Sequence, residues 1–247
     1  MPKVKVALAG IGNCASALIQ GLEYYRKNPE ETVGLVDYSI GGIEPNDIEF
    51  VAAFDVNDKK VGSDLSDAIF AHPNNTAKII DVPNLGVEVT RAPVKDGIGK
   101  YLKDVVDVQD PNGADVVDII KSSGADILIN YLPVGSTDAT KYYAQCALDS
   151  NVGFINSIPV FIASDPEWQA KFIDKGLPIA GDDVMSQLGA TVVHKSLIKL
   201  FVERGVKVDE TYQLNIGGDA DFLNMLEESR LVDKRESKTS AVRAMSP

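Results

Sequence analysis

Short apolar runs alternate with longer amphipathic stretches along this chain, and the alternation predicts a parallel sheet with crossover helices. Five runs have the length and the branched or aromatic side chains that are typical of strands. They are Val4 to Ala9, Glu49 to Asp55, Asp126 to Leu132, Gly153 to Asn156 and Leu177 to Ala180. The third run is almost continuously apolar, as expected of a central strand that is buried on both faces.

Amphipathic periodicity predicts four helices between and after these strands. They are Asn13 to Lys27, Asp138 to Leu148, Pro166 to Lys175 and Gln187 to Arg204. Gly205 follows the last helix, in the position where a glycine commonly ends one. Residues 28–48 hold three glycines and two prolines with little periodicity, so we expect an inserted loop there.

The pattern changes near residue 187. A long helix, a predicted strand at Tyr212 to Ile216 and a polar segment with lysines follow it. We therefore divide the chain into a first domain at residues 1–186 and the beginning of a second, α+β unit at residues 187–247.

A glycine-rich turn joins the first strand to the first helix. Gly10-Ile-Gly12-Asn-Cys-Ala15 matches the GxGxxA fingerprint of Rossmann-type dinucleotide-binding domains. Gly10 permits the tight turn, Gly12 lets the backbone approach a pyrophosphate, and Ala15 allows close packing of helix on strand. The N–H groups at the helix N-terminus then face the anion. We predict an α/β fold with a doubly wound parallel sheet that binds a dinucleotide.

Asp55 ends the second strand and is the candidate acceptor for the hydroxyl groups of the adenosine ribose. A carboxylate at this position favours NAD over NADP, because it repels the 2′-phosphate. The inserted loop explains its long separation from the glycines. The alternative interpretation is an ordinary βα turn in which Asp55 only caps the strand.

Composition and charge limit the class of protein. The 247 residues are 45% hydrophobic and 24% charged, no apolar run is long enough to cross a bilayer, and the start does not resemble a signal peptide. Cys14 and Cys146 are far apart, as expected in a reducing compartment. These features predict a soluble cytoplasmic protein without a membrane partner. The net charge of −12 argues against a nucleic-acid partner.

Three polar segments are candidates for a substrate site. Residues 132–136 (LPVGS) and 180–183 (AGDD) each follow a predicted strand, where α/β proteins collect ligands. Lys234 and Lys238 stand four apart, so on a helix they would share a face suited to a phosphate or an oxyanion. From the residues alone, a simple turn, a helix cap and a solvated helix face remain open alternatives. No group of residues has the spacing of a tight metal site, so no metal is predicted.

Seven segments, in this order, resemble the archaeal and actinobacterial inositol-3-phosphate synthase family. They are GIGNCAS, EFVAAFDV, NYLPVGS, FINSIPVFIASDP, PIAGDDVMSQLGAT, TYQLNIGGDADFLNML and SKTSAV. The resemblance implies an NAD-dependent isomerase that converts D-glucose 6-phosphate into 1D-myo-inositol 3-phosphate, for inositol and phospholipid biosynthesis. It also implies a homotetramer, with the segment after residue 187 beginning the substrate and oligomerisation domain.

The resemblance also assigns roles to residues. Those implied to contact NAD are Gly10, Gly12, Asn13, Cys14, Asp55, Pro133, Gly135, Ser136, Asn156, Ser157, Asp183, Asp219 and Asp221. The implied catalytic residues are Asp183, Lys234 and Lys238, with the lysines gripping phosphate and stabilising an oxyanion.

This sequence departs from the family pattern at three places. Met185 stands where many relatives have lysine, and Asp219 where they often have asparagine. Relatives also continue well past SKTSAV with further active-site lysines, whereas the sequence stops at Pro247. We therefore keep as an alternative a truncated, non-catalytic NAD-binding paralogue. A simple dehydrogenase, which would accumulate NADH, is a third hypothesis.

Overall fold

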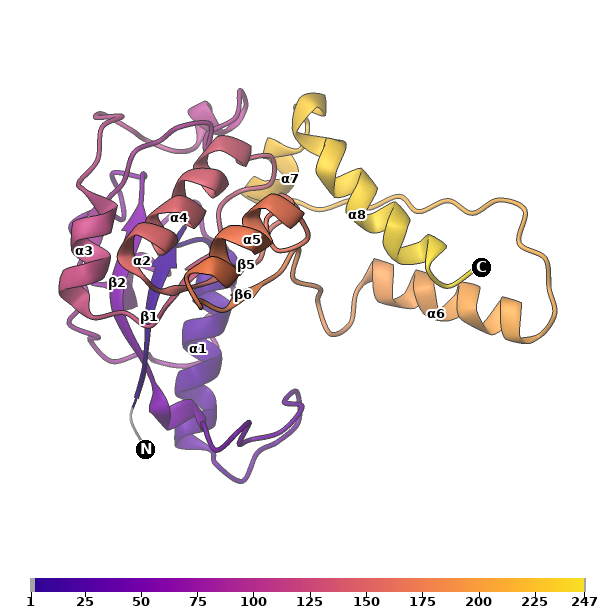
Figure 1. The fold of residues 1–247 in the computed structure, drawn as a ribbon, viewed down its shortest axis with the longest axis horizontal. Helices are drawn as coiled ribbons and strands as arrows, with labels where there is room; N and C mark the ends of the chain where they lie inside the picture. The colour runs from indigo at the N-terminus through magenta and orange to yellow at the C-terminus, as the bar shows by residue number, and fades with distance from the viewer. Residues whose placement is uncertain (1–2, 247) are drawn as a thin grey trace.

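The computed structural model describes residues 3–246, and its core is a six-stranded sheet in which every pairing is parallel (Figure 1). The strands are β1 (Val4–Ala9), β2 (Ile48–Asp55), β3 (Val89–Arg91), β4 (Ile127–Asn130), β5 (Gly153–Asn156) and β6 (Ile179–Ala180). Their order is β3-β2-β1-β4-β5-β6, the order of the doubly wound dinucleotide-binding fold. The predicted fold class is confirmed. The strand order reverses between β1 and β4, and ligands of such sheets bind at this point.

The described residues form eight α-helices, and the first five of them pack against the two faces of the sheet. They are α1 (Asn13–Lys27), α2 (Leu65–Ala68), α3 (Val116–Ser123), α4 (Thr137–Ser150), α5 (Pro166–Asp174), α6 (Ala190–Glu203), α7 (Ala220–Asn224) and α8 (Val232–Arg243), with short 3₁₀ turns η1 (Pro45–Asp47), η2 (Leu102–Asp104) and η3 (Glu228–Leu231). Val6 and Leu8 of β1 pack with α1 and α2, whereas Ala7 and Ala9 pack with α3, α4 and α5. Burial on both faces fixes the carboxyl ends of the strands that carry the site.

Most of the predicted elements match the structure closely. β1, α1 and β5 have the predicted bounds. β4 ends two residues before the predicted Leu132, because the Leu132 N–H donates to the side chain of Asn130 (3.2 Å) instead of extending the ladder. α6 begins at Ala190 rather than Gln187, and Gly205 follows it with φ 73°, as expected for a glycine after a helix. β3, α2 and α3 were not predicted.

The strand predicted at Tyr212 to Ile216 is wrong. The segment is extended, but it pairs with no strand among residues 3–246. Tyr212, Leu214 and Ile216 retain the alternation of a strand, and all three are strongly exposed. The apolar alternation is therefore present, but no strand among residues 3–246 pairs with this segment.

The chain after β6 leaves the sheet and then returns to it (Figure 1). α6 lies to the side of the sheet and packs against α8, and a long extended connection leads back to α7. α7 contacts η2 near the carboxyl edge of the sheet. Residues 28–47 form the predicted irregular loop, closed by η1. The domain boundary at residue 187 stays a prediction. Among residues 3–246, no helix combines the length and apolarity needed to span a membrane.

Candidate functional site

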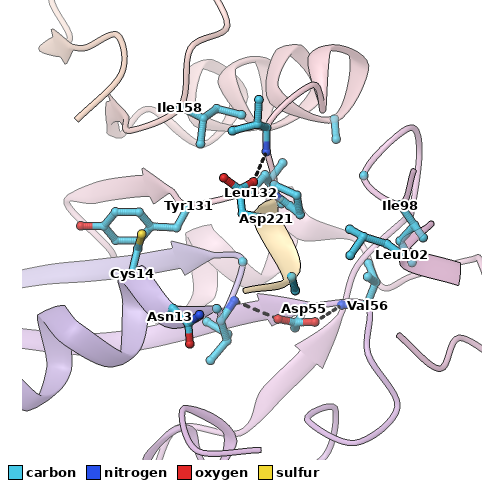
Figure 2. Close-up of a pocket in the computed structure, with 18 of the residues that line it drawn as sticks. Asn13, Cys14, Asp55, Val56, Ile98, Leu102, Tyr131, Leu132, Ile158 and Asp221 are labelled. Carbon is cyan, nitrogen blue, oxygen red and sulfur yellow. Dashed lines mark hydrogen bonds between the residues drawn. The ribbon is translucent and has the colours of Figure 1, made fainter. Parts of the chain in front are cut away.

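A cavity of about 310 Å³ lies at the carboxyl edge of the sheet, at the reversal point between β1 and β4 (Figure 2). Turns after β1, β2, β4 and β5 form its floor, and residues of α7 and α8 contribute to its wall. The sequence-predicted residues that line it are Gly10, Gly12, Asn13, Cys14, Asp55, Pro133, Ser157, Asp183, Asp219, Asp221 and Lys234. Those absent from its lining are Gly135, Ser136, Asn156 and Lys238. One cavity thus joins the glycine-rich turn to the acidic residues and one of the two lysines.

The glycine-rich turn needs its two glycines for different reasons. Gly10 has φ 87°, and a Cβ there would lie 2.7 Å from the carbonyl oxygen of Tyr131. A side chain is therefore excluded by both backbone conformation and space. A Cβ on Gly12 would meet nothing within 4 Å. The open space above Gly12 is where a phosphate could approach the backbone.

Asn13 and Cys14 begin α1. The Asn13 carboxamide oxygen accepts the Thr76 hydroxyl (2.8 Å) and the backbone N–H of Asn75 (2.9 Å), so this side chain ties α1 to the loop after α2. Partial burial of the Cys14 thiol raises its pKa, and the carboxyl groups of Asp221 and Asp219 raise it further. Cys14 therefore remains a neutral thiol near neutral pH and is a poor nucleophile.

Asp55 lies between the glycine-rich turn and the residues after β2 (Figure 2). Its Oδ1 accepts the N–H groups of Val56 (2.7 Å) and Asn57 (2.9 Å), and its Oδ2 accepts the N–H of Ile11 (2.8 Å). A carboxylate has about four acceptor positions, so one remains on Oδ2 for a ligand hydroxyl. Asp55 caps its strand, as the alternative interpretation had it, and it also faces the cavity. The two roles are compatible.

A second cluster forms where α8 approaches the turn after β6. Lys234 donates to Asp183 Oδ1 (2.8 Å) and the Ser237 hydroxyl donates to Asp183 Oδ2 (2.7 Å). Asp183 has φ 62°, a left-handed conformation uncommon for a residue with a side chain. Such conformations often occur at functional sites. These bonds orient the carboxylate and the ammonium at the cavity wall.

Lys238 lies one turn beyond Lys234 on α8, so the predicted helical spacing of the pair is present. Burial lowers the pKa of Lys238, and the neighbouring positive charge of Lys234 lowers it further. Lys238 therefore releases its proton more readily than an ordinary lysine does.

Asp219 and Asp221 sit at the start of α7. Asp219 caps this helix by accepting the N–H of Phe222 (2.9 Å). Burial is the main cause that raises the pKa of Asp221, and the charge of Asp219 adds to the effect. Asp221 also accepts the N–H of Val134 (3.2 Å), which connects α7 to the turn after β4. The acidic residues thus bring α7 to the cavity.

Buried polar contacts fix the turns after β4 and β5. The Ser136 hydroxyl donates to the Pro133 carbonyl (2.6 Å). Asn156 donates to Asp182 (2.7 Å) and accepts from Asn130 (2.9 Å). Ser136 and Asn156 are therefore engaged within the protein, and their contact with a cofactor stays a prediction.

Gly135 has φ 82° and touches Arg230, since a Cβ there would lie 2.4 Å from the Arg230 Cβ. Ser157 lines the cavity next to Tyr131 and Ile158. The roles of Gly135 and Ser157 as cofactor contacts also stay predictions.

Sequence reasoning missed several polar residues of this site, among them Lys60 and Ser237. Lys60 is buried and lines the cavity, and Ser237 holds Asp183. Lys60 follows Lys59 directly in the sequence, and nothing in that pair indicates which lysine is buried. Ser237 lies between the two predicted lysines, and this position was the available signal.

Strand order and a glycine-rich turn at the reversal point define a doubly wound α/β protein, the architecture typical of dinucleotide-binding domains. The chain is 56% identical over 242 residues to the inositol-3-phosphate synthase of Mycolicibacterium smegmatis, covering 97% of this chain and 67% of that protein. The chain belongs to the inositol-3-phosphate synthase family.

Further comparisons agree with this family. A family model described as myo-inositol-1-phosphate synthase matches residues 189–247. The inositol-3-phosphate synthase of Corynebacterium glutamicum is 53% identical over 99% of this chain, which spans 68% of that relative. The crystal structure of Ari2 aligns with a TM-score of 0.79 at 35% identity, over 98% of this chain and 68% of that one. A myo-inositol-1-phosphate synthase-related protein from Thermotoga maritima aligns with a TM-score of 0.78 at 25% identity, over 98% and 70%. The chain thus spans about two thirds of the relatives that it matches.

Proposed function

We propose that this protein is an inositol-3-phosphate synthase, an isomerase that uses NAD to convert D-glucose 6-phosphate into 1D-myo-inositol 3-phosphate. The observation that carries the proposal is that the glycine-rich turn and the Asp183–Lys234 pair line the same cavity. A cofactor on the turn and a phosphorylated sugar beside the pair would therefore be close enough to react. Membership of the synthase family supports the same conclusion.

The residues present suit a dinucleotide. The space above Gly12 is open, and the first turn of α1 carries no acidic residue that would repel a pyrophosphate. The remaining acceptor position on Asp55 suits a ribose hydroxyl. When bound, NAD supplies the hydride acceptor for oxidation of sugar C5 and the hydride donor for its later reduction.

The lysines would stabilise the negative charge that the sugar develops. After oxidation at C5, transfer of a proton from C6 to a neutral lysine amine would give an enolate; C6 would then attack the aldehyde carbon C1, and the alkoxide formed at C1 would take this proton back. Asp183 orients Lys234 at the cavity wall, where a fixed cationic donor would stabilise an oxyanion. Lys238 has a lowered pKa, which suits proton transfer, but it does not line the cavity, so its role as the group that exchanges this proton stays a prediction. Their shared helix face would also attract the phosphate.

The test is a turnover assay that follows phosphorus and nicotinamide together. With glucose 6-phosphate and a trace of NAD⁺, we expect the ³¹P signal of inositol 3-phosphate to grow while absorbance at the NADH band stays flat. Net NADH formation would instead indicate a dehydrogenase. Tight NAD⁺ binding without any new phosphorus signal would favour a non-catalytic paralogue. A homotetramer and a cytoplasmic location stay predictions, and light scattering would measure the first.

A further inference from the structure

Lys60 is a buried cation at the floor of the cavity. It follows β2 and is only 4% exposed. Its ammonium donates to the Ile11 carbonyl oxygen (2.7 Å) and to the Asn74 side-chain oxygen (2.9 Å), and it lies 3.7 Å from Asp55 Oδ2. Burying an ammonium is costly unless oxygen atoms surround it, so this environment is built around the charge.

Both backbone polar groups of Ile11 are held by side chains. Its N–H donates to Asp55 (2.8 Å), and its carbonyl accepts from Lys60 and also from the Asn74 amide (3.0 Å). Ile11 is the central residue of the Gly10–Gly12 turn. The side chains of Asp55, Lys60 and Asn74 therefore hold both polar groups of the central residue of this turn.

The direction of the Ile11 carbonyl decides the direction of the next N–H. A trans peptide is planar and its C=O and N–H point in opposite directions. Because Lys60 and Asn74 hold the Ile11 carbonyl, the Gly12 N–H is turned away from them. Among residues 3–246, no protein acceptor is recorded for this N–H. It is therefore a donor held ready for an external anion.

We propose that Lys60 is a positioning residue for the cofactor: by holding the Ile11 carbonyl, it aims the Gly12 N–H at the pyrophosphate of the dinucleotide. This inference rests on the proposed NAD site and adds a residue to it. Asn74 assists by donating to the same carbonyl. Loss of the Lys60 ammonium frees the Ile11–Gly12 peptide to rotate. The affinity should therefore fall for ligands that carry the pyrophosphate.

The experiment compares Lys60→Met with Lys59→Met by titration with NAD⁺, ADP-ribose and adenosine. Lys59 is a matched control, because it is adjacent in sequence but half exposed, with a surface ion pair to Asp107 (2.9 Å). We expect Lys60→Met to weaken the binding of NAD⁺ and ADP-ribose by about tenfold, the effect of losing about one hydrogen bond from the Gly12 N–H to the pyrophosphate. Adenosine, which lacks the pyrophosphate, should change by less than about twofold, and Lys59→Met should match the wild type for all three ligands.

Other results would overturn the inference. Equal losses of affinity for adenosine and for NAD⁺ would mean that the substitution damages the whole site. An unchanged affinity for NAD⁺ would mean that Lys60 only neutralises the charge of Asp55. If Lys60→Met does not fold, Asn74→Ala provides the same comparison, with a smaller selective loss expected and the same contradicting outcomes. Failure of the wild-type protein and Lys59→Met to bind NAD⁺ would instead contradict the proposed function itself, and this inference with it.

Discussion

At the scale of single residues, the site combines carboxyl groups and ammonium groups that modify one another. Burial is the main cause that raises the pKa of Asp221. Burial also lowers the pKa of Lys238, and the positive charge of Lys234 lowers it further. The two carboxylate oxygens of Asp183 accept hydrogen bonds from Lys234 and Ser237. Charged groups are thus kept in a partly desolvated cavity at some expense of stability, an arrangement that is common at functional sites.

Asp221→Asn should stabilise the protein at neutral pH. The folded-state pKa of Asp221 is raised above its ordinary 3.8, so the folded state pays to ionise it once the pH exceeds that folded pKa. The contribution of this carboxyl group to the free energy of unfolding is fully present below pH 3.8. It is lost as the pH rises through the folded-state pKa. Asparagine still accepts the Val134 N–H and carries no charge. Thermal melts should show a higher Tm for the variant at neutral pH and a shrinking difference as the pH falls toward 4. A difference that grows on acidification would contradict this assignment.

Lys234→Met should reduce turnover while leaving the cofactor in place. Removal of one oriented cationic donor typically costs a factor of about 100 or more in kcat. NAD⁺ affinity should change by less than about threefold, because the glycine-rich turn and Asp55 are untouched. Lys199→Met is the control, since Lys199 is exposed and pairs with Glu203 on the surface of α6. Equal losses in kcat for both variants would mean that Lys234 has no special role.

Prediction from sequence succeeded for residues whose role follows from local pattern. Gly10 and Gly12 were identified from a strand–turn–helix motif. The structure explains Gly10 by its positive φ and by the nearby Tyr131 carbonyl, and it leaves open space at Gly12. Lys60 could not be identified in this way. Its burial depends on oxygens of Ile11, Asn74 and Asp55 that only the tertiary fold assembles.

At the scale of elements, α7, η3 and α8 form a cover that is attached to the carboxyl edge of the sheet. Arg230 of η3 is almost buried, and its guanidinium donates to the Asp96 carbonyl (2.6 Å) and pairs with Glu227 (3.2 Å). Asn224 of α7 donates to the Val134 carbonyl (2.8 Å). Few apolar side chains of this segment are buried, so polar contacts account for much of its attachment.

Arg230→Ala should loosen this cover without unfolding the sheet. Loss of a buried, charged hydrogen-bond donor leaves the Asp96 carbonyl and Glu227 without their partner. We expect hydrogen exchange in residues 220–231 to accelerate by about tenfold or more, with β1 and β4 unchanged. Arg235→Ala is the control, because Arg235 is exposed and forms a surface ion pair with Glu228. Accelerated exchange throughout the sheet would contradict a local role.

The elements that the sequence predicted best are those with local signals at both ends. α1 begins after the glycine-rich turn and ends at the predicted Lys27, and β5 has the predicted bounds. The strand predicted at Tyr212 to Ile216 failed, because alternation describes one strand whereas a ladder requires two. β3, with only three residues, is too short for its period to be recognised.

At the scale of the whole molecule, the net charge of −12 contrasts with a site proposed for two phosphorylated ligands. The local arrangement resolves this contrast. Gly12, the N-terminus of α1 and Lys234 all line the cavity. Anion binding therefore depends on a few fixed groups rather than on the average charge, and we expect moderate sensitivity to salt.

The most direct test of this account is a calorimetric titration of the protein with NAD⁺ and with NADP⁺. We predict one NAD⁺ per chain and at least about tenfold weaker NADP⁺ binding, because the carboxylate of Asp55 repels the 2′-phosphate. Saturating NAD⁺ at about 100 times its Kd should add about 2.7 kcal/mol to the free energy of unfolding. Absence of saturable NAD⁺ binding up to about 1 mM, the upper end of ordinary cofactor and substrate affinities, or a preference for NADP⁺, would contradict the account.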